Sequence, residues 1–122
     1  MTIFALELER LAKENMNHEE AKDLQPLSEQ EIKERLKEFP GWEFDGNKIS
    51  KSFEFPSFND VLALIVALTP FCNKIDHHPD IYWSYKDATF CLTRYSIGGK
   101  VTERDFAVAS RIEELYGFNS GD

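Results

Sequence analysis

The sequence has few of the residues that hold a chain together covalently or through a metal ion. Its two cysteines, Cys72 and Cys91, have neither the number nor the spacing of a disulfide framework or a zinc site. Both lie in apolar segments, so we expect reduced thiols buried in a core. The N-terminus carries Glu7 and Glu9 among its apolar residues and lacks the basic region of a secretory signal, which favours a cytoplasmic protein.

Basic residues and long apolar runs are also scarce. Lysine and arginine number 14 against 22 acidic residues, giving a formal net charge of -8, whereas direct nucleic-acid binding needs basic residues that neutralise phosphates. The same charge disfavours an anionic membrane surface. The longest strongly apolar run, Val61 to Leu68, is too short to span a bilayer. We therefore expect no direct nucleic-acid partner and no membrane association.

Aromatic residues, in contrast, are plentiful. Ten phenylalanines among 122 residues predict a core filled largely by rings. The length suits one domain, and no internal repeat or low-complexity tract divides it. Apolar residues recur at helical spacing from Ile3 to Leu11, which predicts an amphipathic helix. After Pro26, Ser28 with Glu31 three residues on predicts a capped helix that ends at Pro40-Gly41.

Two more helices are expected further along the chain. A long apolar helix capped by Ser57 or Asn59 should end near His77, with a kink or an irregular turn at Pro70. The last helix should run from Thr102 to Tyr116.

Two hairpins separate these helices. Residues 42–55 alternate apolar and polar side chains around the turn Asp45-Gly46-Asn47. Residues 81–85 and the strand expected from Thr89 to Tyr95 form the second hairpin, with a turn at Lys86-Asp87. The order α-α-β-β-α-β-β-α predicts an α+β fold, in which a four-stranded antiparallel sheet has helices packed on one face.

Histidine is rare as well, with His18, His77 and His78 as the only three. His18 lies in a polar stretch, and we expect it to be a solvated bystander. His77-His78 lies where a long helix stops and a strand begins, and imidazole suits proton transfer near neutral pH. The alternative is that positive character at a helix end merely favours the helix dipole. A metal site is disfavoured, because no third imidazole or thiolate accompanies the pair.

The residues around this pair resemble a known family. The run Asp76-His77-His78-Pro79-Asp80, with Tyr85 six residues after the proline, is similar to the central motif of the pterin-4a-carbinolamine dehydratases. The resemblance spans Leu27 to Leu115, most of the chain. Its further matches are Pro40-Gly41-Trp42, Phe53-Glu54-Phe55, Phe58-Asn59, Gly98-Gly99, Thr102-Glu103-Arg104-Asp105-Phe106, Ala109-Ser110 and Ile112.

The resemblance implies a lyase that dehydrates 4a-hydroxytetrahydropterins to quinonoid dihydropterins, recycling the cofactor of aromatic amino acid hydroxylases. It implies no metal and no bound organic cofactor. Residues 26–122 would form the family's domain, and residues 1–25 a helical N-terminal extension. The resemblance also implies assembly into homodimers or homotetramers. An edge strand from Thr89 to Tyr95 would suit sheet extension across a two-fold axis.

By the match, His77 and His78 are the catalytic residues. Dehydration needs one proton delivered to the leaving oxygen and one removed from a ring nitrogen, and the sequence does not say which imidazole does which. The expected substrate-binding residues are Asn73, Asp76, Pro79, Tyr95 and Asp105, with Pro79 fixing the histidine backbone and Asp105 completing the pocket.

Asn73 and Tyr95 depart from the family's pattern, which has an acidic residue and a histidine at these positions. An amide can still orient an imidazole by hydrogen bonding, and a tyrosine can donate a hydrogen bond to a substrate oxygen. Two alternatives to the dehydratase therefore stay open. One is a catalytically degenerate relative that acts as a protein-binding, assembly or coactivator module, with the helix from Ile3 to Leu11 as a partner-binding face. The other is a pterin enzyme with a different reaction that uses Tyr95 as donor.

Overall fold

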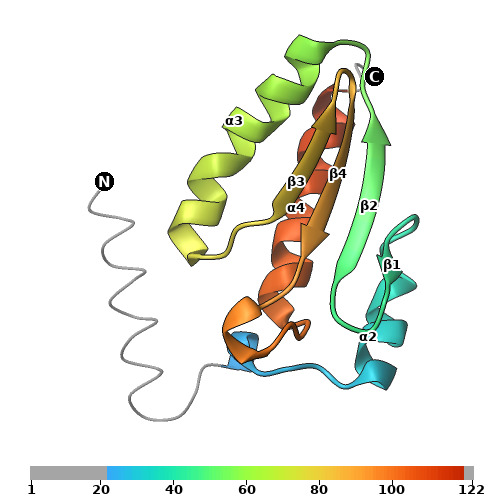
Figure 1. Ribbon diagram of the computed structural model, residues 1–122, viewed down its shortest axis with the longest axis vertical. Helices are drawn as coiled ribbons and strands as arrows, with labels where there is room; N and C mark the ends of the chain where they lie inside the picture. Colours follow the sequence, from blue (N-terminus) through green and yellow to red (C-terminus); the bar gives the residue numbers. More distant parts are fainter. Residues whose placement is uncertain (1–21, 120–122) are drawn as a thin grey trace.

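The computed structural model describes residues 22–119, which form an α+β fold around one antiparallel sheet. The sheet has four strands in the order β1-β2-β4-β3 (Figure 1). The strands are β1 (Glu43–Phe44), β2 (Ile49–Glu54), β3 (Asp80–Ser84) and β4 (Asp87–Leu92). The predicted fold class is confirmed. The helix predicted from Ile3 to Leu11 lies outside the described residues, and the division of the chain at residue 25 stays a prediction.

Three helices and two short 3₁₀ turns complete the described part of the chain. They are η1 (Lys22–Leu24), α2 (Glu29–Leu36), α3 (Phe58–Ile75), η2 (Tyr95–Ile97) and α4 (Glu103–Asn119). In Figure 1, α4 lies behind β3 and β4, and α3 runs alongside it. The described helices occur in the predicted order.

Local capping explains where α2 and α3 begin. The Ser28 hydroxyl accepts a hydrogen bond from the Glu31 backbone N–H, and the Glu31 carboxylate accepts one from the Ser28 backbone N–H. This reciprocal capping box is the one predicted, and such a cap contributes about 1 kcal/mol. Ser57, rather than Asn59, caps α3 through the Asp60 backbone N–H.

Helix α3 continues through Pro70, so the predicted irregular turn does not occur. Proline removes the backbone hydrogen bond to the carbonyl four residues earlier, here that of Val66. Val66 and Pro70 both lie on the exposed side of the helix, where water can solvate the released carbonyl. By length and mean hydropathy, α3 is also the one described helix that could cross a membrane, a property shared by core helices of soluble proteins.

The second hairpin differs from its prediction in three ways. Its turn is at Tyr85-Lys86, with Tyr85 in the left-handed region at φ 50°, so Asp87 already belongs to β4. Strand β4 ends at Leu92, and Tyr95 lies in η2 because the bridge between Arg94 and Lys100 turns the chain back. Strand β4 also pairs with β2 on one side and β3 on the other. It is therefore a central strand, and the expectation that it forms the sheet edge is wrong.

The core lies between the sheet and the helices and is rich in rings, as predicted. Phe53 makes edge contacts with Phe90, Trp42 and Tyr116. Each fully buried phenylalanine contributes about 2–3 kcal/mol by removing apolar surface from water. The helical side of this core is formed by Val61, Leu64, Leu68, Cys72, Phe106, Val108, Ala109 and Ile112. This packing fixes the end of α3 against the start of α4, where the candidate site lies.

Candidate active site

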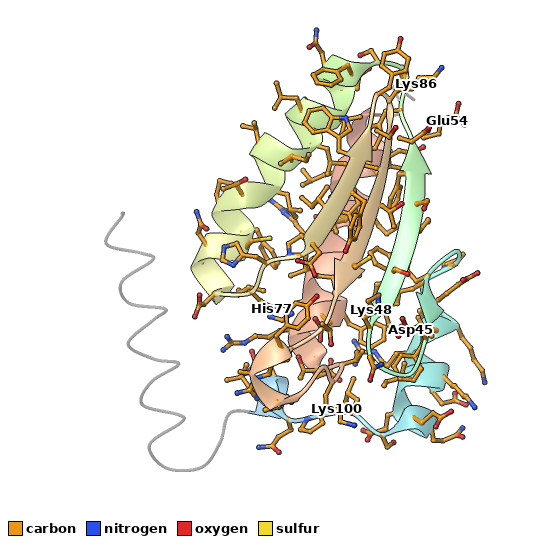
Figure 2. All side chains as sticks on the ribbon, viewed as in Figure 1. Asp45, Lys48, Glu54, His77, Lys86 and Lys100 are labelled. Carbon is orange, nitrogen blue, oxygen red and sulfur yellow. The ribbon has the colours of Figure 1, made fainter. Side chains whose placement is uncertain are left out.

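The site begins where α3 ends. Ile75 is the last helical residue, and Asp76 adopts the left-handed conformation with φ 53° and ψ 50°. The backbone N–H of His77 then bonds to the Cys72 carbonyl at 3.1 Å. A left-handed residue directs the chain away from the helix axis, and this turn places the buried His77 side chain toward α4 (Figure 2). The helix therefore ends two residues before the predicted position.

Asp105 faces His77 from the first turn of α4. Its side chain is 0% exposed, and Oδ1 contacts Nε2 of His77. Its Oδ2 accepts a hydrogen bond from the Thr102 backbone N–H at 2.8 Å and another from the Thr102 hydroxyl at 3.3 Å. A carboxylate at a helix N-terminus is also stabilised by the helix dipole. The buried carboxylate is thus satisfied on both oxygens.

This contact determines which nitrogen of His77 carries the ring proton and which one is free to accept a proton. A carboxylate only accepts hydrogen bonds, so the ring proton belongs on Nε2. Nδ1 then carries the lone pair, and it has no hydrogen-bond partner among the described residues. The arrangement resembles the logic by which a carboxylate holds an imidazole in one tautomer and one orientation. His77 is therefore organised to accept a proton at Nδ1.

His78 has a different environment from its neighbour. It is exposed, and its Nε2 lies 2.8 Å from Oδ1 of Asn73, which lies in the last turn of α3. Because an amide oxygen accepts, the His78 proton on Nε2 is donated to Asn73. Asp76 is exposed and Pro79 partly buried beside this pair. Asn73 thus orients an imidazole as the sequence suggested, and that imidazole is His78.

Tyr95 is linked to the site region through Asp80, which is not one of the predicted site residues. Its hydroxyl donates a hydrogen bond to Oδ2 of Asp80, which follows Pro79 at the start of β3. This hydrogen bond is the main reason that the pKa of Tyr95 is raised to about 12. Tyr95 remains 67% exposed. Within the described part of the chain, it contacts neither imidazole directly. Asp80 is the last residue of the histidine motif, and this place in the motif was its only sequence signal.

The first turn of α4 ties the site to three other elements. Glu103 pairs with Arg35 of α2, and Asp105 contacts His77. Between them, Arg104 donates to the Ile75 carbonyl at 2.7 Å and to the Asp23 carboxylate at 2.8 Å. Arg104 belonged to the recognised motif, but no sequence pattern indicated either partner.

Neither thiol is organised for chemistry. Burial raises the pKa of Cys72 to about 11, and burial also raises that of Cys91. Both are free and buried, as predicted, and a protonated buried thiol is a poor nucleophile. Over residues 22–119, no cluster of three or more histidine, cysteine or acidic side chains could hold a metal ion.

Comparison with known proteins identifies the family. A family model described as pterin 4 alpha carbinolamine dehydratase matches residues 25–115. A Streptomyces avermitilis protein provisionally named as such a dehydratase is 41% identical over 92 residues, covering 75% of this chain and 91% of the relative. A provisionally named relative from Sulfolobus acidocaldarius is 38% identical over 89 residues, covering 73% of this chain and 97% of its own length.

Solved structures agree with this family. A Brucella melitensis protein described as a transcriptional coactivator/pterin dehydratase superposes with a TM-score of 0.70 at 29% identity, covering 75% of this chain and 98% of the other. A pterin dehydratase-like RuBisCO assembly factor of the alpha-carboxysome, at 23% identity and a TM-score of 0.50, covers 62% of this chain and 87% of its own and shares the fold. The sequence match over residues 25–115 and the relatives at 38–41% identity show that the chain belongs to the pterin 4-alpha-carbinolamine dehydratase family.

Proposed function

We propose that the protein dehydrates 4a-hydroxytetrahydropterins to quinonoid dihydropterins, using His77 and His78 for acid and base catalysis. The observation that carries this proposal is the buried contact between His77 and Asp105, directly beside the exposed His78. Two adjacent imidazoles with different partners suit a reaction that moves two protons in opposite directions. Family membership supplies the substrate class.

In the proposed reaction, the bond between C4a and the hydroxyl oxygen breaks and the oxygen leaves as water. His77 takes the proton of a ring nitrogen on its Nδ1, because Asp105 compensates the positive charge that the ring gains. His78 delivers a proton to the leaving oxygen, because its exposed position lets it regain one from solvent. The electrons of the broken N–H bond form the C=N bond of the product.

The substrate would be held by the groups around this pair. The aminopyrimidinone edge of a pterin presents adjacent N–H donors, which suit a carboxylate acceptor. Asp76 is exposed and lies directly before His77, so it is the proposed acceptor. Pro79 restricts the backbone after His78. The hydroxyl of Tyr95 is engaged by Asp80, so Tyr95 would contact substrate as part of that pair.

Stopped-flow absorbance tests the proposal by following 4a-hydroxytetrahydropterin decay with and without the protein. His77→Ala and His78→Ala, made separately, should each lower the catalysed rate by about 10²–10⁴-fold. His18→Ala is the matched control, because it removes the remaining histidine of the chain, which belongs to none of the proposed site residues. Full activity in both folded site variants would refute the assignment.

A second function is supported by one feature of α3. Phe58, Leu62 and Val66 form an exposed apolar stripe, with Leu62 at 45% and Val66 at 61% exposure. Such a surface on a helix is typical of protein contacts, and the Brucella melitensis relative is described as a coactivator as well as a dehydratase. A folded protein that neither binds reduced pterins nor accelerates their decay would favour a protein-binding role over catalysis.

Assembly and location are part of the same proposal. We infer a homodimer or homotetramer in the cytoplasm, an expectation that rests on family membership. Light scattering at several protein concentrations would test the oligomer, and a monomer at all concentrations would exclude it.

A further inference from the structure

The 3₁₀ turn η1 lies just before the residues that match the family model, yet it contacts the site. The match begins at residue 25, whereas η1 spans Lys22–Leu24. Leu24 is buried in the fold. The two arginines that bond to η1 are each followed directly by a predicted site residue. Arg104 precedes Asp105, and Arg94 precedes Tyr95.

Arg104 joins the backbones that carry His77 and Asp105. Its side chain is 12% exposed, and Nη1 donates to the carbonyl of Ile75 at 2.7 Å. Ile75 is the last residue of α3, so its carbonyl has no partner within the helix. His77 follows two residues later, and Asp105 follows Arg104 directly. The Arg104–Ile75 bond therefore links the two backbone segments from which His77 and Asp105 meet.

Asp23 controls the orientation of the Arg104 guanidinium. Its Oδ2 accepts from Nε of Arg104 at 2.8 Å, on the edge of the guanidinium plane away from Nη1. The donors of a guanidinium have fixed directions, so a carboxylate on Nε orients the whole group. With Nε held, Nη1 points at the Ile75 carbonyl. Without Asp23, Arg104 can rotate and lose that carbonyl.

The second arginine links η1 to the loop that carries Tyr95. Nη1 of Arg94 donates to the Leu24 carbonyl, and its Nε donates to the Ser96 hydroxyl at 3.1 Å. Arg94 also pairs with Lys100 in an isolated bridge. Both Arg104 and Arg94 therefore bond to η1, and these two bonds keep Asp23 beside Arg104.

We propose that Asp23 and Arg104 are positioning residues of the active site: Asp23 holds Arg104 on the Ile75 carbonyl, and this bond keeps His77 in register with Asp105. Neither residue touches the substrate in this proposal. The segment before the family domain thereby contributes to the catalytic geometry. The kinetic part of this inference rests on the proposed dehydratase function, whereas its structural part does not.

Kinetics and a double-mutant cycle test the proposal in the full-length protein. Asp23→Ala, which removes the acceptor of Arg104 Nε, should lower kcat by about tenfold with KM unchanged, because small misplacements of a catalytic group are costly. Arg104→Lys, which keeps the charge but cannot bond to both partners, should lower kcat at least as far. Adding Asp23→Ala to Arg104→Lys should then have no further effect, since Asp23 acts through Arg104. Additive losses would overturn the proposal.

The matched control is Glu114→Ala on α4, the helix that carries Arg104. It removes one carboxylate from the exposed pair Arg111–Glu114, which lies further along α4. This variant should keep the wild-type kcat. An equal loss in Glu114→Ala and Asp23→Ala would mean that the loss of any carboxylate on this surface affects the rate, which would refute a specific role for Asp23.

A spectroscopic measurement separates this inference from the proposed function. The Nε2–H proton of His77 should give a low-field NMR resonance that is absent from His77→Gln. In Asp23→Ala, its exchange with solvent should be faster, while Glu114→Ala leaves it unchanged. This outcome would support the positioning role even if the wild-type protein showed no dehydration. An unaltered resonance in folded Asp23→Ala would overturn it, whether or not Arg104→Lys folds.

Discussion

Replacing Asp105 by asparagine should reverse the tautomer of His77 at small structural cost. The introduced amide can keep its oxygen on the Thr102 backbone N–H, which bonds to Oδ2 of Asp105 at 2.8 Å. The amide nitrogen then faces Nε2 of His77, where Oδ1 of Asp105 otherwise accepts. Because an amide N–H donates, Nε2 must become an acceptor, and the ring proton moves to Nδ1. The atom proposed to accept a proton from the substrate is then already protonated.

The expected magnitudes follow from these contacts. Dehydration should fall by about 10²–10⁴-fold, because general-base catalysis at Nδ1 is lost. The three charge-assisted hydrogen bonds of Asp105 become neutral ones, and the favourable interaction with the α4 dipole disappears. Together these changes should lower the free energy of unfolding by about 2 kcal/mol. With an ordinary urea dependence, the unfolding midpoint should decrease by about 1 M.

Stopped-flow decay of the pterin substrate and urea unfolding, measured on the same preparation, test both expectations. Asp105→Ala is the comparison variant, because it removes all three hydrogen bonds and should cost about 3–5 kcal/mol by leaving His77 and Thr102 unpaired. If Asp105→Asn kept wild-type activity while folded, the tautomer argument would be refuted. If its stability equalled that of Asp105→Ala, the retained Thr102 bond would be refuted.

Three further predictions concern the surroundings of the site and the start of α2. Asp80→Asn should bring the pKa of Tyr95 down from about 12 toward its usual 10, as seen by tyrosinate absorbance against Tyr95→Phe. The raised pKa means that the folded state binds the Tyr95 proton more tightly than the unfolded state does. The Tyr95–Asp80 hydrogen bond therefore stabilises the fold below pH 10, and this stabilisation is lost as the pH rises from 10 to about 12. Asp80→Asn should abolish this pH-dependent loss of stability. Asn73→Glu should move the alkaline limit of the pH–rate profile upward by about one unit, because a carboxylate near His78 favours the imidazolium, whereas Asn73→Gln should not. Ser28→Ala should lower the free energy of unfolding by about 1 kcal/mol in urea titrations without changing kcat, because it removes only the cap of α2.

Several elements could be predicted because their signals are local. The capping box of α2 involves residues three positions apart, and the apolar spacing of α3 and α4 repeats within each helix. The histidine pair and its flanking proline are contiguous, so the family resemblance identified them directly. Helix α3 continues through Pro70 because a missing hydrogen bond is tolerated on the exposed side of the helix. The sequence around Pro70 does not show that this side is exposed.

Other features depended on how distant segments pack. Strand β4 was expected at a sheet edge because of the family resemblance, but its position is decided by pairing with both β2 and β3. Tyr95 occupies a 3₁₀ turn because the bridge of Arg94 with Lys100 reverses the chain after Leu92. Its bond to Asp80 then follows from tertiary placement, since no spacing rule relates residues 15 positions apart.

The sequence by itself determined the family, the α+β class, the helix caps and the two histidines, because each depends on neighbouring residues or on a contiguous motif. The tertiary structure decided the partners that would give those histidines different roles. Asp105 reaches His77 across 28 positions, and Asp23 reaches Arg104 across 81. Such pairs form only when helix packing brings the end of α3 to the start of α4, and that packing depends on the whole core.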